Sequence, residues 1–173
     1  MRKTISESSA LLKIWNHKKN KSLSPDTTTL GTHQKVWWIC KKNHEWNTIA
    51  RTANKTGCPY CAGRIASPEN NLSSLYPKLT KEWHPSKNDN LSPNMVLSTT
   101  AKKAWWVCKK GHEWEASIRR RTQPNKPTGC PYCAGRIASP ENNFAFLYPE
   151  KARQWHPSKN GINLPNMFTA GSH

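Results

Sequence analysis

The sequence predicts a series of small α+β modules rather than one large domain. Hydrophobic residues make up 35% of the 173 residues, which is low for a conventional core in a chain of this length. Nine Trp and four Tyr nevertheless exclude a disordered chain, in which aromatic residues are scarce. A long internal repeat divides the chain into units of about 70 residues, as in an array of small units. Each unit must therefore bury a small aromatic cluster and obtain further stability from another source.

The repeat consists of three kinds of segment that recur in the same order. The copies are Thr56–Asn71 and Thr128–Asn143, which agree letter for letter; Trp37–Trp46 and Trp105–Trp114; and Ile14–Asn20, Glu82–Asn88 and Gln154–Asn160. From them we expect one module at residues 4–76, a second at residues 77–148, and a partial third repeat at residues 149–170. The partial repeat lacks the cysteine-containing segments of the other two.

The start of each module predicts a short helix followed by a polar turn. Leu79 and Trp83 stand four residues apart, as on one face of a helix, and Leu11 and Trp15 repeat the spacing. The second of these helices should end before Pro85, because the residue that precedes a proline avoids the α region.

A β-hairpin is expected next, and then a second helix. The expected strands are residues 35–40 and 104–108, with returning strands at residues 45–51 and 113–119. Adjacent Trp side chains in a strand point to opposite faces, so one Trp of each pair should be buried and the other partly exposed. Ser67 and Ser139 should begin the second helix, since each is a good N-cap followed by a proline and an acidic residue.

Each full module carries three cysteines and one histidine in the order Cys-x3-His, then Cys-x2-Cys. The two sets are Cys40, His44, Cys58 and Cys61, and Cys108, His112, Cys130 and Cys133. Zinc favours four such ligands in a tetrahedron, and two close pairs allow two tight turns to approach one ion. We therefore expect two zinc ions. Tetrahedral sites rich in sulfur also accept iron, which is a minor alternative.

The competing interpretation of the cysteines is a disulfide framework. Three cysteines in each module would leave one thiol unpaired, and the repeated histidine would have no role. With all four positions of the tetrahedron filled by protein, no position stays open for water or substrate, so the ion should be structural rather than catalytic. It would supply the stability that units of this size lack.

These motifs together resemble a known family. The pattern Trp-x-Cys-x3-His-Glu-Trp, then Gly-Cys-Pro-Tyr-Cys, Ser-Pro-Glu-Asn-Asn, Leu-Tyr-Pro and Glu-Trp-His-Pro-x-Lys-Asn is similar to the tandem "probable zinc-ribbon" repeats of bacterial and viral proteins. The resemblance covers nearly the whole chain. It implies a zinc-ribbon or treble-clef-like fold, with a β-hairpin and short helices, and a role with nucleic acid. Some of those modules accompany Vsr-like endonuclease domains, but no segment here resembles that nuclease. Asn43 stands where the second module has Gly111, a left-handed position that Asn tolerates.

The charge of the chain points to a polyanionic partner. Lys and Arg number 27 against 10 Asp and Glu, a formal net charge of +17, which concentrates polyanions around the protein. A merely soluble basic surface and attraction to acidic lipid are the alternatives, and we favour nucleic acid, DNA before RNA. The candidate contact residues are Lys41, Lys42, Arg51, Arg64, Lys109, Lys110, Arg119, Arg120, Arg121, Lys126 and Arg136.

Several of these basic residues have a second interpretation. Lys41, Lys42 and their repeats lie between two zinc ligands, where they would also offset the negative charge of a Cys3His zinc centre. Arg64 and Arg136 precede the expected second helix, whose N-terminus would favour a phosphate, but they could equally bond a carbonyl of the preceding turn. The run Arg119–Arg121 is expected near the hairpin tip, facing phosphate rather than forming a solvated face.

Two other functions stay open at this point. The segment His84–Asn88 suggests a His-Asn nuclease centre, but up to three copies of an active site are less plausible than three copies of a structural corner. A protein-interaction adaptor, with a nuclease or another protein as partner, is the third possibility. No segment reaches the roughly 20 apolar residues of a membrane span or forms a signal-peptide core, so we expect an intracellular location and no membrane partner.

Overall fold

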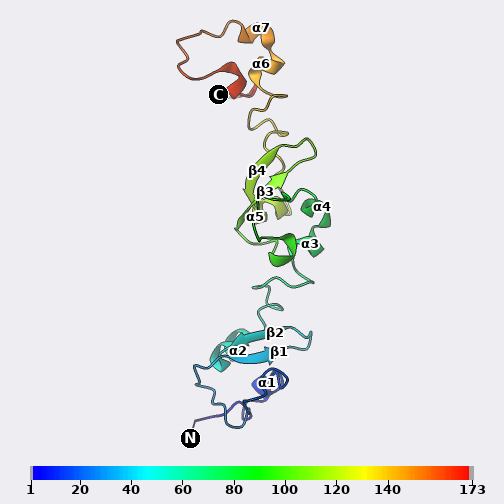
Figure 1. The fold of residues 1–173 in the computed structure, drawn as a ribbon, viewed down its shortest axis with the longest axis vertical. Helices are drawn as coiled ribbons and strands as arrows, with labels where there is room; N and C mark the ends of the chain where they lie inside the picture. The colour runs from blue at the N-terminus through cyan, green and yellow to red at the C-terminus, as the bar shows by residue number, and fades with distance from the viewer. Residues whose placement is uncertain (1, 172–173) are drawn as a thin grey trace. The chain divides into compact units, whose positions relative to one another are not determined.

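The computed structural model describes residues 2–171. These residues form two compact units, unit 1 up to Asn70 and unit 2 from Asn71 onward. Unit 1 contains α1 (Ser9–Leu12), β1 (Val36–Ile39), β2 (Glu45–Thr48) and α2 (Ala50–Thr56). Unit 2 contains α3 (Leu72–Leu75), α4 (Pro77–Thr80), η1 (Pro93–Met95), β3 (Lys103–Val107), β4 (Glu113–Ser117), α5 (Ile118–Thr122), α6 (Phe144–Leu147), α7 (Pro149–Ala152) and η2 (Pro165–Met167). Small α+β modules, each with one antiparallel hairpin and short helices, are thus confirmed (Figure 1).

The two hairpins are built alike. Strands β1 and β2 pair antiparallel with Trp38 opposite Trp46, and β3 and β4 pair with Trp106 opposite Trp114. Trp38 and Trp106 are fully buried, whereas the neighbouring Trp of each pair is half-buried, as the alternation of a strand predicts. The indole N–H of each buried Trp donates to a main-chain carbonyl of the partner strand, which satisfies the polar atom inside the core.

Ahead of each hairpin the chain forms a small lobe whose two ends are joined by a β-bridge. Lobe 1 closes at Thr4 and Thr29, and lobe 2 at Asn71 and Leu97. A third lobe closes at Asn143 and Thr169, with α6, α7 and η2 in the places of α3, α4 and η1. Residues 71–76, which the sequence assigned to the first module, therefore belong to lobe 2 and to the second compact unit.

Each of the first two lobes adds a short stretch of chain to the edge of its hairpin. In unit 2, Trp83 forms a bridge with Trp106, and the two indoles meet edge to face with centroids 5.2 Å apart. In unit 1, Trp15 and Trp38 repeat the arrangement at 5.7 Å. These main-chain bonds correct the expected helix, which ends at Thr80 rather than before Pro85, because residues around Trp83 pair with β3 instead of continuing the helix.

An asparagine of each lobe clamps the same strand. Asn88 accepts a hydrogen bond from the main-chain N–H of Trp105 at 2.7 Å and donates to the carbonyl of Trp105 at 3.0 Å. Asn20 makes the same pair of bonds to Trp37, at 2.9 and 2.7 Å. A side-chain amide here replaces the hydrogen bonds of a missing neighbouring strand, so the clamp fixes the lobe on its hairpin.

Two further expectations are corrected by local hydrogen bonding. The returning strands stop at Thr48 and Ser117, because α2 and α5 follow at once and bury Ala50, Ala53 and Ile118. No helix begins at Ser67 or Ser139. The side chain of Asn70 accepts from the Ser67 N–H at 2.7 Å and holds a turn, and α3 begins later with Asn71 as its N-cap.

No helix within residues 2–171 combines the length and the apolar character that crossing a bilayer requires.

Replacing Asn88 by alanine should lower the free energy of unfolding of unit 2 by about 2 kcal/mol, because the main-chain N–H of Trp105 loses its partner and the Trp105 carbonyl keeps only the bond from the His84 N–H. The measurement is urea denaturation followed by Trp fluorescence. Asn90→Ala, at an exposed position of the same loop, is the matched control. Equal midpoints for the two variants would show that the clamp contributes no stability.

Candidate metal centres and the cationic surface around them

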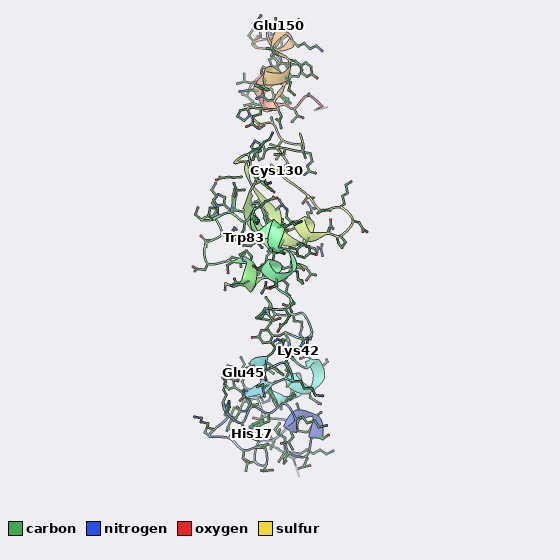
Figure 2. The ribbon with its side chains drawn as sticks, turned by 90° about the vertical axis from the view of Figure 1, so that its right-hand side faces the viewer. His17, Lys42, Glu45, Trp83, Cys130 and Glu150 are labelled. Carbon is green, nitrogen blue, oxygen red and sulfur yellow. The ribbon has the colours of Figure 1, made fainter. Side chains whose placement is uncertain are left out.

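Each candidate metal centre lies where two turns of one unit meet. Cys40 follows β1 and His44 precedes β2, so the first ligand pair spans the hairpin turn. Asn43 has φ 61° at this turn and Gly111 has φ 81° at the equivalent place, which confirms the left-handed conformation expected there. The second pair, Cys58 and Cys61, lies on the turn after α2. Figure 2 labels Lys42 on the first turn of unit 1 and Cys130 on the second turn of unit 2.

The four ligand atoms of each centre are within 4.8 Å of one another. In unit 1 the Nδ1 atom of His44 lies 3.5, 3.6 and 3.3 Å from the Sγ atoms of Cys40, Cys58 and Cys61. In unit 2 the corresponding distances from His112 to Cys108, Cys130 and Cys133 are 3.5, 3.7 and 3.4 Å.

These spacings fit a tetrahedral zinc ion. With zinc–sulfur bonds of about 2.3 Å and a zinc–nitrogen bond of about 2.0 Å, the edges of a tetrahedron are about 3.5 to 3.8 Å long. The Sγ atoms of Cys40 and Cys61 are 3.7 Å apart, and those of Cys108 and Cys133 are 3.8 Å apart. A disulfide would bring two sulfur atoms to about 2.05 Å, and all six cysteines are free thiols. The two centres are therefore Cys3His zinc sites.

The electrostatics of the thiols also call for a cation. Burial opposes ionisation of Cys40, but the main-chain N–H groups of Lys42 and His44 donate to its sulfur and lower its pKa to about 7. Burial and the adjacent thiols of Cys40 and Cys58 raise the pKa of Cys61 to about 11. The same opposition occurs between Cys108 and Cys133. The thiol of Cys40 therefore ionises readily, whereas ionisation of Cys61 beside it is opposed. A divalent ion bound among the thiols favours the thiolate form of all of them.

A carboxylate that the sequence analysis did not single out orients each ligating histidine. The Nε2 atom of His44 lies 3.2 Å from Glu69, and that of His112 lies 3.0 Å from Glu141. The Ser67 hydroxyl, the main-chain N–H of Glu69 and His44 together lower the pKa of Glu69 to about 2. This carboxylate–histidine pairing fixes which ring nitrogen faces the metal. The sequence feature that could have indicated these glutamates is the identical Ser-Pro-Glu segment in both modules, which was interpreted as a helix start.

The basic residues expected to contact nucleic acid are exposed, with the exception of Arg121. Its side chain is 4% exposed, pairs with Glu82 at 2.6 Å, and lies over the rings of Trp106 and Trp114 at 4.6 and 5.0 Å. Arg121 therefore belongs to the core of unit 2, and its assignment to a nucleic-acid surface is wrong. The expected place of the arginine run is corrected as well, because Arg119 and Arg120 lie on α5 rather than at the hairpin tip.

Arg64 and Arg136 each bond a main-chain carbonyl, which was the alternative to contact with a phosphate. Arg64 donates to the carbonyl of Thr56 at 2.8 Å, and Arg136 donates to that of Gly129 at 3.4 Å. Neither residue precedes a helix directly, since Ser67–Asn70 and its repeat form turns. Both side chains nevertheless stay exposed, so one end of each guanidinium is held while the rest faces solvent.

A groove recurs at the same place in both units, between the returning strand and the second ligand turn. In unit 1 it has a volume of about 400 Å³, and its charged lining residues are Arg64 and Glu45. In unit 2 its volume is about 720 Å³, and three basic side chains line it, Lys103, Arg120 and Arg136, together with Glu115, which pairs with Lys103. The repeat thus places arginine beside a concave surface in both units.

His84, for which a structural corner was favoured over a nuclease centre, forms such a corner. The Nδ1 atom of His84 accepts hydrogen bonds from the main-chain N–H groups of Ser86 and Lys87, and its Nε2 atom lies 2.8 Å from Glu113. The ring is 6% exposed, so both nitrogens are engaged inside the unit.

The fold and the two centres define a tandem zinc-binding protein of the treble-clef class. The model of a family described as a probable treble clef zinc finger domain matches the chain twice, at residues 11–64 and 79–136. These matches cover more than half of the chain, and the chain belongs to this family. No curated protein matches it.

Replacing Glu141 by glutamine should weaken zinc binding at the unit 2 centre about tenfold, because the carboxylate that orients His112 loses its charge. Competition with a chromophoric chelator measures the affinity, and the unit 1 centre serves as the internal reference. The control Glu150→Gln alters an exposed glutamate that pairs with Arg153 on α7. Unchanged zinc affinity in Glu141→Gln would show that this carboxylate does not contribute to metal binding.

Proposed function

We propose that the protein binds nucleic acid through exposed basic side chains displayed on two zinc-stabilised modules, with DNA preferred to RNA and with no chemistry of its own. The observation that carries the proposal is the arginine-lined groove repeated in both units, on a chain of net charge +17. Grooves edged with guanidinium groups suit phosphates, which arginine binds with two parallel hydrogen bonds. The preference for DNA comes from the resemblance to modules that accompany Vsr-like endonucleases.

The zinc ions support this function indirectly. Four protein ligands close each coordination shell, so the ion holds the turns in place and leaves the surface side chains to make contacts. Lys41 and Lys42 lie on the first ligand turn of unit 1 and are exposed, and Lys109 and Lys110 repeat them in unit 2. The two units would contribute equivalent contacts on one polymer, and their linkage would raise the overall affinity.

Phosphate contacts dominate in this proposal, and base reading contributes little. Trp37 and Trp105 are half-buried, and Lys19 and Lys87 lie over their rings at 4.2 and 4.8 Å. A ring covered by a lysine offers less surface for stacking on a base. Binding should therefore tolerate many sequences and weaken steeply as salt rises.

The double variant Arg119→Ala/Arg120→Ala should weaken binding to a DNA duplex at every sequence tested. It should also reduce the slope of log K against log salt by about 2, because two phosphate contacts are lost. Fluorescence anisotropy at a series of salt concentrations, with DNA and RNA oligonucleotides in parallel, measures both effects.

The control for this experiment is Lys78→Ala/Lys81→Ala, which removes the same charge from exposed positions in lobe 2. Zinc content should stay at two ions per chain in both variants. If the two double variants lose equal affinity, α5 is no specific contact surface. If wild-type protein with its zinc binds neither DNA nor RNA at low salt, the proposed function fails.

A further inference from the structure

Lobe 3, residues 143–169, repeats the fold of lobe 2 without a hairpin. The main-chain N–H of Phe144 donates to the carbonyl of Phe168 at 2.7 Å, as that of Leu72 does to Val96 at 2.9 Å. Lobes 1 and 2 each join a two-stranded sheet, whereas no strand pairs with lobe 3 within residues 2–171 (Figure 1). The other two lobes therefore show what such a lobe holds.

Lobes 1 and 2 recognise their hairpins through the same contacts. An asparagine clamps the main chain of the first strand, and a Trp meets the buried Trp of that strand edge to face, as described above. A third contact involves the glutamate that follows the ligating histidine. In unit 2, His84 and Lys87 both bind Glu113.

Unit 1 makes this third contact with different chemistry at one position. Glu45 accepts from the side-chain amide of Asn16 at 2.7 Å and from the ammonium group of Lys19 at 2.6 Å. Two donors from the lobe thus hold one glutamate of the hairpin in both units. The glutamate directly follows the ligating histidine of the hairpin in both units. The lobe therefore recognises a residue whose position is fixed by the zinc site of a Cys3His hairpin.

Lobe 3 carries the same set of groups. Trp155, His156, Lys159 and Asn160 stand where lobe 2 has Trp83, His84, Lys87 and Asn88.

The local bonds of the histidine and the asparagine are also the same, and the Trp155 indole N–H donates to the carbonyl of Asn163 at 2.9 Å within lobe 3. The Nδ1 atom of His156 accepts from the main-chain N–H groups of Ser158 and Lys159 at 3.2 and 3.0 Å, and the Asn160 amide donates to the carbonyl of His156 at 3.3 Å. The matching distances in lobe 2 are 3.2, 3.1 and 3.3 Å. The corner is therefore already shaped for the contact.

The outward groups of this corner have no acidic or strand partner among the described residues. His156 is exposed, whereas His84 is 6% exposed under Glu113. Two apolar side chains that lobe 2 does not have flank the corner, Ile162 at 87% and Leu164 at 52% exposed. The proposed contact would cover these two apolar side chains together with the outward groups of the corner.

We infer that lobe 3 binds the β-hairpin of a Cys3His zinc module other than the two hairpins at residues 36–48 and 103–117. The occupant carries a Trp-bearing first strand, whose main chain Asn160 clamps, and a glutamate after its ligating histidine, which His156 and Lys159 bind. A second copy of this chain is a poorer occupant, because its two hairpins are already covered by its own lobes and exchange would gain no contact.

Two residue differences between lobe 3 and lobe 2 indicate how tightly lobe 3 should bind the hairpin. Lys151 and Asn163 replace Leu79 and Leu91, which pack on the hairpin cluster in unit 2. The contact of lobe 3 is therefore less apolar than that of lobe 2, and the association should be reversible. It concerns a protein partner and is independent of the proposed nucleic-acid binding.

The test uses the full chain and a synthetic peptide of residues 101–138, loaded with one zinc ion. This peptide contains β3, β4 and four ligands but no lobe. NMR signals from the Trp155 indole and the Asn160 side-chain amide report binding at lobe 3. We expect a saturable change at one peptide per chain. No saturable change in these signals with a zinc-loaded peptide would overturn the inference.

Matched variants separate this contact from unspecific adhesion. Glu113→Gln in the peptide should weaken binding at least tenfold, and Glu115→Gln, an exposed glutamate on the same strand, should not. In the chain, Asn160→Asp should weaken it at least tenfold, with Asn166→Asp as control. Equal affinities within either pair would contradict the proposed contact.

A charge exchange guards against a variant that merely disturbs lobe 3. Lys159→Glu in the chain should weaken binding of the original peptide, and Glu113→Lys in the peptide should restore it. Absence of restoration would contradict the glutamate contact. Dimerisation of the peptide-free chain in sedimentation, abolished by Asn160→Asp, would assign the surface to a second copy and overturn the inference as well.

Discussion

The coordination of zinc by three thiolates and one imidazole is the constraint on which the rest of each unit depends. It joins the hairpin turn to the turn after the following helix, and without it these turns would bring several thiols together with nothing to offset their charge. Burial and adjacent sulfurs raise the pKa of Cys61 and Cys133 to about 11, whereas donated N–H groups lower that of Cys40 and Cys108 to about 7. A divalent ion resolves this conflict, and the free energy of binding it becomes folding free energy.

Around the metal, each unit is completed by a lobe that acts as a third strand. The lobe contributes a Trp against the buried Trp of the hairpin, an asparagine that clamps the main chain, and two donors for one glutamate. One positive charge forms part of this packing. Arg121 is buried against the rings of Trp106 and Trp114 and pairs with Glu82 of the lobe. Some of the positive charge therefore stabilises the units, and the remainder is displayed around the grooves.

Much of the fold could be predicted because it follows from local chemistry. The ligand spacing located both metal centres, the adjacent Trp residues placed the first strands and their buried faces, and the repeat gave the number of modules. The errors arise where a tertiary hydrogen bond outcompetes a local signal. The helix before Pro85 ends early because Trp83 pairs with β3, and Ser67 forms a turn because Asn70 binds its N–H. Arg121 was misplaced because a run of three arginines does not indicate which one faces inward, and Glu69 was missed because its histidine partner is 25 residues away in the chain.

The dependence of each unit on its metal can be tested by removing zinc under reducing conditions while following Trp fluorescence and near-ultraviolet circular dichroism. We expect two zinc ions per chain. The buried environments of Trp38 and Trp106 should be lost as the ions are withdrawn and should return when zinc is restored. Protein that keeps its near-ultraviolet spectrum without metal, or that contains paired disulfides in place of zinc, would contradict this dependence on the metal.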